Sequence, residues 1–216
     1  QEEIELRRRL VGLDPSNATA QWGLGACLVR LGTLQRTEGH HAAAETLLCS
    51  AVDHYRALRI AMPVSAVDQE LASALSVLGA SYMRQGKAES AREAMEESVE
   101  IQRGIVAREG QASDAGLRLS SMLDYLGSLY MNTGRLTAGL AVLEESLGLL
   151  RTLTESMPEN PKLRHGLSIT LIKTGEARRM LGEAWDASAP FYEESLALSS
   201  QLVLQYPRIE DLKRGL

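Results

Sequence analysis

Apolar residues recur at steps of three and four along most of this chain, with polar residues between them. This spacing predicts amphipathic α-helices, because residues three and four apart lie on the same face of a helix. The clearest stripes are Leu71, Leu75, Leu78 and Tyr82; Ala91, Met95 and Val99; Leu119, Met122, Leu126 and Tyr130; and Leu140, Leu143, Leu147 and Leu150. Each stripe would bury one side of its helix, so the pattern predicts an all-α chain.

The stripes belong to an internal repeat with a period of about 48 residues. A Leu-Gly pair marks the first three copies, and in the fourth copy the leucine is replaced: Leu31-Gly32, Leu78-Gly79, Leu126-Gly127 and Thr174-Gly175. A second glycine follows in every copy: Gly39, Gly86, Gly134 and Gly182. Further downstream the aligned pairs are Ala44 and Leu48, Ala91 and Met95, Gly139 and Leu143, and Ala187 and Phe191.

Each copy is predicted to be two helices joined by a turn at the second glycine. Glycine favours the left-handed conformation in which many helices end. The first glycine would lie inside a helix, where it costs about 1 kcal/mol relative to alanine. Close approach of the partner helix is the expected compensation at Gly79 and Gly127.

The second helices share a Glu-Glu-Ser motif at residues 96–98, 144–146 and 193–195, the last displaced by one position. The glutamates could form an acidic ladder on the outer side of the repeats. A solvated polar face is the favoured interpretation, because charged residues on helix surfaces usually face water.

The repeat predicts a single array over residues 1–216. Its first segment would be the outer helix of a preceding repeat, and its last the start of a further helix, so both ends are expected to be open and the chain to be an excerpt of a longer protein. The predicted segments are 1–13, 14–62, 63–109, 110–157, 158–206 and 207–216.

The motifs resemble the tetratricopeptide repeat. The matching positions are Leu75, Leu78, Gly79, Tyr82, Gly86, Ala91, Met95 and Ser98 in one copy, and Leu123, Leu126, Gly127, Tyr130, Gly134, Gly139, Leu143 and Ser146 in the next. The first copy departs from the family at Gln35, and the fourth at Thr174 and Arg178. The resemblance implies a right-handed α-solenoid of antiparallel helix pairs. The long period is similar to the arrays attached to bacterial signalling proteins such as Ser/Thr kinases, STAND-type NTPases and CHAT proteases.

Composition supports a helical fold and disfavours several classes of function. Aromatic residues make up only 4% of the chain, which disfavours β-sandwiches and barrels. The formal net charge of −5 gives no general attraction to nucleic acid, although an RNA- or DNA-binding solenoid stays open as an alternative. Two cysteines are too few for a disulfide framework, and no apolar run is long enough for a membrane span. A cytoplasmic location without membrane partners is expected.

No motif in the sequence predicts catalysis, so we expect no catalytic residues, cofactor or metal. The stretch from Gly79 to Lys87 departs from a phosphate-binding loop in its spacing and in the residue that follows. His40 and His41 have no third ligand at zinc spacing. Cys27 and Cys49 are interpreted as packing residues, as are Trp22 and Trp185, with binding anchors as the alternative for the tryptophans.

In a tetratricopeptide-like superhelix the first helix of each pair lines the concave side. The residues predicted to line that groove are Arg36, Ser73, Ser76, Ala80, Met83, Ser121, Asp124, Ser128, Met131, Ile172, Glu176 and Arg179. Small residues would let a ligand backbone approach, and methionines adapt to varied partners. The expected function is non-catalytic binding of a peptide or protein partner. A groove that faces only water is the alternative interpretation. A regulatory arm that holds a kinase or CHAT-type protease domain of the same chain is the main alternative.

Overall fold

The computed structural model describes residues 2–14 and 17–206. Within these ranges the regular structure is helical throughout, with no strand. The helices are α1 (Glu2–Leu13), α2 (Ala18–Thr37), α3 (His41–Ala61), α4 (Ser65–Arg84), α5 (Ala88–Glu109), α6 (Asp114–Asn132), α7 (Leu136–Ser156), α8 (Pro161–Met180) and α9 (Trp185–Gln205). The predicted fold class, an all-α solenoid of consecutive antiparallel helix pairs, is confirmed. The further helix predicted at 207–216 lies outside the described residues.

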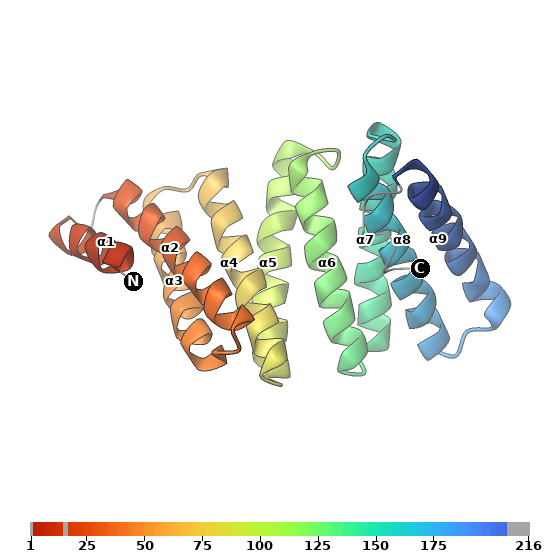
Figure 1. Ribbon diagram of the computed structural model, residues 1–216, viewed down its shortest axis with the longest axis horizontal. Helices are drawn as coiled ribbons and strands as arrows, with labels where there is room; N and C mark the ends of the chain where they lie inside the picture. The colour runs from red at the N-terminus through yellow and green to blue at the C-terminus, as the bar shows by residue number, and fades with distance from the viewer. Residues whose placement is uncertain (1, 15–16, 207–216) are drawn as a thin grey trace. The chain divides into compact units, whose positions relative to one another are not determined.

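The chain divides into two compact units, one ending at Ile105 and the other beginning at Val106. In the first unit α2 packs on α3, α3 on α4, and α1 on α2 (Figure 1). In the second unit α6 packs on α7, α7 on α8, and α8 on α9. The first helices of successive pairs also touch, α2 with α4 and α6 with α8. The side of each unit formed by its first helices, α2 and α4 or α6 and α8, is called its inner face.

The turns inside the helix pairs are built on glycine, as the sequence predicts. Gly39, Gly86, Gly134 and Gly182 have φ angles of 85°, 72°, 76° and 87°. An L-residue with a side chain rarely adopts this left-handed region, whereas glycine pays no steric penalty there. The four turns thus reverse the chain at the end of α2, α4, α6 and α8.

The glycines inside first helices lie against the second helix of the same pair. A Cβ on Gly79 would be 2.6 Å from Met95 Cγ, and one on Gly127 would be 2.7 Å from Leu143 Cγ. Gly32 has the same relationship to Leu48. The prediction of close helix approach is confirmed, and it explains why glycine is tolerated in mid-helix.

The alignment of the fourth copy was wrong after its turn glycine. The turn between α8 and α9 spans residues 181–184, one residue longer than the turn at 85–87. As a result Ser188, rather than Ala187, is buried. Tyr192 rather than Phe191 takes the place of Leu143, because the Tyr192 ring lies nearest to a Cβ on Gly175. The inserted residue moves every later position of α9 by one.

The Glu-Glu-Ser motif is only partly a solvated face. Its serines are buried, and Ser146 Oγ donates a hydrogen bond to the backbone carbonyl of Ser120 at 3.0 Å. Its second glutamate bridges successive second helices: Glu97 pairs with Arg56 at 2.5 Å, and Glu194 with Arg151 at 2.8 Å. The motif therefore ties α5 to α3 and α4, and α9 to α7 and α8.

Candidate functional site

The inner face of the second unit is formed by α6 and α8, and it carries most of the predicted groove residues. Along α6 the residues on this face lie three and four apart, as do those along α8, because that spacing follows one side of a helix. Ser121, Glu176 and Arg179 are exposed, whereas Asp124, Ser128, Met131 and Ile172 are half-buried. The contact between α6 and α8 brings Asp124 of the one helix beside residues of the other.

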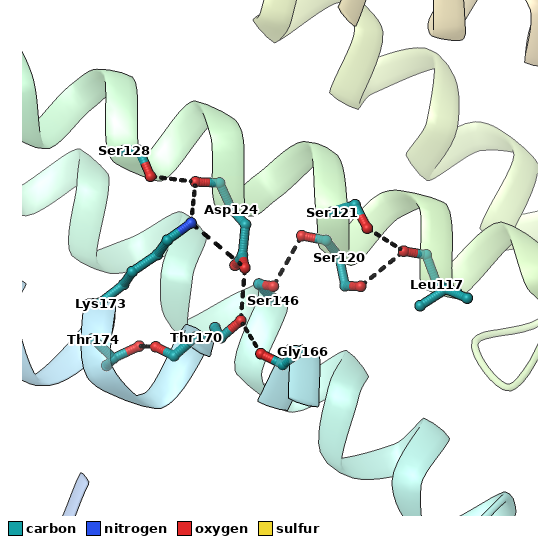
Figure 2. Close-up of polar contacts among 10 residues, drawn as sticks. All are labelled: Leu117, Ser120, Ser121, Asp124, Ser128, Ser146, Gly166, Thr170, Lys173 and Thr174. Atoms are coloured by element: carbon teal, nitrogen blue, oxygen red, sulfur yellow. Dashed lines mark hydrogen bonds and ion pairs between the residues drawn. The ribbon is translucent and has the colours of Figure 1, made fainter. Parts of the chain in front are cut away.

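Asp124 is the centre of a polar network that joins the two helices (Figure 2). Thr170 Oγ1 donates to Asp124 Oδ2 at 2.7 Å. Lys173 Nζ lies 3.8 Å from the same carboxylate oxygen and donates to the Asp124 backbone carbonyl at 3.4 Å. Asp124 thus receives contacts from two successive turns of α8, which fixes the spacing of the inner face.

Burial governs the electrostatics of this network. Removal from water raises the pKa of Asp124, because the charged carboxylate loses solvation; the nearby Lys173 ammonium and the Thr170 hydroxyl oppose the shift. The buried carboxylate and its cation therefore act mainly as a tie between α6 and α8. Lys173 was missed by the sequence reasoning, because its separation of 49 residues from Asp124 places it on the next first helix but does not show that the two side chains meet.

Two predicted groove serines are bonded to their own helix. Ser121 Oγ donates to the Leu117 carbonyl at 3.1 Å, and Ser128 Oγ to the Asp124 carbonyl at 2.8 Å (Figure 2). Their hydroxyl protons are used in these hydrogen bonds, but their oxygens can still accept one. Both serines therefore present small polar surface to a ligand and could accept a hydrogen bond from it.

Exposed apolar side chains adjoin this network. Tyr125 of α6 is 58% exposed and Ile169 of α8 is 38% exposed. Ile169 falls on the face predicted from sequence, whereas Tyr125 was missed. Met131, by contrast, packs inward: its Cγ is 3.2 Å from where a Cβ on Gly139 would lie. The ring of Tyr125 and the aliphatic chain of Ile169 are the apolar contacts this face offers.

The inner face of the first unit is formed by α2 and α4. Ser73 is exposed, and Arg36, Ser76, Ala80 and Met83 are half-buried. The face is therefore dominated by small side chains with Met83 and Arg36 at its end. The two inner faces differ in chemistry, since the second carries the Asp124–Lys173 pair and the exposed ring of Tyr125.

The remaining candidates have local structural roles. Cys27 and Cys49 are half-buried free thiols, and burial raises the pKa of Cys27. His40 Nδ1 contacts Gln35 Oε1 at 3.1 Å, and no group of three His, Cys, Asp or Glu in the described residues is placed to hold a metal. Trp185 is 57% exposed, so it is not the buried packing residue that the sequence predicts. Its ring stacks on that of Tyr192, with the centroids 5.7 Å apart.

Trp22 is half-buried at the start of α2 and lines a small cavity near the first turn of that helix. The cavity has a volume of about 360 Å³ and is also lined by Arg7, Ala18, Thr19, Gly23 and Met62. The guanidinium of Arg7 lies over Gly23, where a Cβ would collide with it. Trp22 therefore contributes to the packing of α1 on α2.

The helix pairs of this chain turn on a left-handed glycine and come into close contact at a mid-helix glycine. Residues 71–107 match the tetratricopeptide repeat family. The matched tetratricopeptide segment begins within α4 and ends near the end of α5. The resemblance inferred from the sequence motifs is thereby supported, while the longer bacterial type of repeat is not distinguished by this match.

Solved structures show the same fold. The chain is similar to a putative kinesin light chain from Podosopora anserina with nearly identical TPR-like repeats, with a TM-score of 0.54 and 17% identity over 93% of this chain and 87% of that one. It is also similar to MamA, with a TM-score of 0.51 and 14% identity over 92% of this chain and 87% of that one. No curated protein matches the sequence. At these identities the likeness shows the tetratricopeptide-like fold alone.

A membrane-spanning role finds no support in the helices. In the described parts of the chain, none of them combines the length and the apolar character needed to cross a bilayer.

Proposed function

We propose that this chain is a non-catalytic scaffold that binds a peptide or protein segment along the inner faces of its units. Tetratricopeptide-like repeat proteins generally mediate protein–protein interactions, and the fold of this chain is of that kind. The observation that carries the proposal is the inner face of the second unit, where exposed Tyr125 and Ile169 adjoin the Asp124–Lys173 pair.

The chemistry of that face suits an extended or helical peptide. Tyr125 and Ile169 give apolar area for anchor side chains. Glu176 and Arg179 are exposed at one end and offer charges of both signs. Because the Asp124 network holds α6 and α8 in place before binding, little ordering of the scaffold opposes docking.

The finer parts of the proposal rest on the sequence resemblance. The long repeat period favours a cytoplasmic segment of a larger bacterial signalling protein. In that setting the partner could be a catalytic domain of the same chain, such as a kinase or CHAT-type protease. The groove residues of the first unit, Arg36, Ser73, Ser76, Ala80 and Met83, would extend the same binding role.

A peptide library displayed on phage and selected on the wild-type chain tests the proposal. Peptides recovered this way should lose at least about tenfold in affinity for the double variant Tyr125→Glu and Ile169→Glu, because each change removes an apolar anchor and adds a charge. Ala141→Glu, an exposed position on α7, is the matched control and should bind normally. Circular dichroism should show equal helicity in all three proteins. Selected peptides that bind the double variant as tightly as the wild type would place the binding surface elsewhere.

A further inference from the structure

A second cleft lies on the other side of the first unit, between the second helices α3 and α5. It has a volume of about 290 Å³, and its floor is provided by α4. Its lining consists of Cys49, Val52, Asp53, Arg56, Leu75, Leu78, Tyr82, Ser90, Glu93, Ala94 and Glu97. The apolar residues of the lining, Val52, Leu75, Leu78 and Ala94, are at most 7% exposed, and the rim is charged. None of these residues belongs to the inner face proposed above for peptide binding.

Ala94, in the lining of the cleft, is the smallest side chain found at its position of the repeat. The same position of the repeat is occupied by Leu47 in the first copy, Val142 in the third and Phe191 in the fourth, once the longer turn before α9 is taken into account. In the second unit the Phe191 side chain packs on a cluster that includes Leu147 and Leu171. Those two leucines hold the positions of Val52 and Leu75, which line the open cleft. Phe191 therefore occupies volume that the smaller Ala94 side chain does not, although Val52 and Leu75 are themselves only 3% and 2% exposed.

The charges around the filled site are also replaced in the open one. The Arg178 guanidinium lies 5.1 Å from the centroid of the Phe191 ring and forms an ion pair with Glu144. At the corresponding positions the open cleft has Tyr82 and Cys49, whose hydroxyl and thiol are 3.5 Å apart. The open cleft thus lacks both the ring and the cation that complete its counterpart.

The rim of the open cleft is acidic. Asp53, Glu93 and Glu97 face one cation in the lining, Arg56, and Glu93 also lies 3.9 Å from Arg92, which is shared with Glu89 and Glu96. Arg56 is already engaged, since it lies 2.5 Å from Glu97 and 3.9 Å from Asp53. An incoming positive charge would therefore meet an excess of carboxylates, whereas an incoming carboxylate would be repelled.

We propose that this cleft binds an aromatic side chain flanked by a basic residue, contributed by a protein partner. The ring enters over Val52, Leu75 and Ala94, as Phe191 does over the equivalent leucines. The neighbouring lysine or arginine lies at the rim beside Asp53 and Glu93. The partner thereby supplies from outside the pair of groups that Phe191 and Arg178 supply within the second unit.

Cys49 gives a direct readout, because its thiol lines the cleft while Cys27 lies elsewhere, beside Arg7 and Glu3. Alkylation of each thiol by iodoacetamide is followed by mass spectrometry in the presence of blocked tetrapeptides containing Phe-Lys, Ala-Lys or Phe-Glu. The Phe-Lys peptide should slow alkylation of Cys49 at least threefold at saturation and leave Cys27 unchanged. Equal rates for Cys49 with and without Phe-Lys, or equal protection by all three peptides, would overturn the proposal.

Two variants separate occupancy of the cleft from a general effect on folding. Ala94→Phe should fill the cleft, and the second unit shows that the fold accepts phenylalanine at this position. Titration of Phe-Lys, followed by methyl NMR signals, should give at least tenfold weaker binding to Ala94→Phe and unchanged binding to Ala141→Phe, which alters an exposed site on α7. Binding retained by Ala94→Phe with native-like helicity would place the peptide outside the cleft. Selected ligands of the inner face should bind Ala94→Phe normally, so the two proposals can fail independently.

Discussion

The hydroxyl of Ser98 on α5 donates a hydrogen bond to the backbone carbonyl of Ala72 on α4, 2.7 Å away and fully buried. Ser146 has the same relationship to Ser120, and Ser195 to Ser168, so the bond recurs once in each of three helix pairs. The separation along the chain is 26 residues in the first two pairs and 27 in the third, which has the longer turn. A serine repeated in sequence is thus a repeated tie between helices.

Removal of that tie should have a measurable cost. Ser98→Ala is expected to lower the free energy of unfolding by about 1 kcal/mol, the usual net contribution of one buried hydrogen bond. Urea denaturation monitored by circular dichroism measures the change. Ser73→Ala, at an exposed position of α4, is the control and should differ little from the wild type. Equal stability of Ser98→Ala and wild type would show that the bond is energetically neutral.

Leu126 tests the packing of the repeat. It is only 2% exposed, so Leu126→Ala should lower the free energy of unfolding by about 2–5 kcal/mol through lost burial and a residual cavity. Thermal and urea unfolding would both reveal the change. An unchanged melting curve would mean that this position is not part of the core.

Two glycines in mid-helix should respond in opposite directions to alanine. A Cβ on Gly127 would lie 2.7 Å from Leu143 Cγ, and Leu143 is fully buried, so Gly127→Ala is expected to destabilise the protein by about 1–3 kcal/mol. Gly148 on α7 is exposed and has no atom within 4 Å of its added Cβ. Gly148→Ala should therefore stabilise by up to about 1 kcal/mol through helix propensity. Changes of the same sign would contradict the close approach at Gly127.

Asp124 predicts a pH dependence of stability. Its pKa is raised by burial above the ordinary value of 3.8, so the folded state favours the protonated carboxyl more than the unfolded state does. The stability of the wild type relative to Asp124→Asn should therefore fall as the pH rises from below 3.8 through the raised pKa, and then level off. Asparagine keeps an acceptor for Thr170. Urea titrations of both proteins between pH 3 and pH 7 measure the difference. A relative stability that rises with pH would show that folding lowers, rather than raises, the pKa of Asp124.

The sequence was most informative where the repeat dictates local geometry. The turn glycines, the close contacts at Gly79 and Gly127, and the buried leucine stripes follow from helix periodicity and from the conformational freedom of glycine. The candidate site was harder to predict from the sequence than the fold. Lys173 and Tyr125 were missed because sequence periodicity shows which face a residue occupies but not which neighbour it meets or how much water reaches it.

Sequence alone determined the helical class, the pairing of helices and the positions of the reversing turns, because these depend on contacts within one repeat. Only the tertiary structure decided that Asp124 lies beside Thr170 and Lys173, and that Phe191 packs on Leu147 and Leu171 at the position where the first unit has Ala94. These features depend on side chains from different helices, and their packing is set by the three-dimensional stacking of those helices.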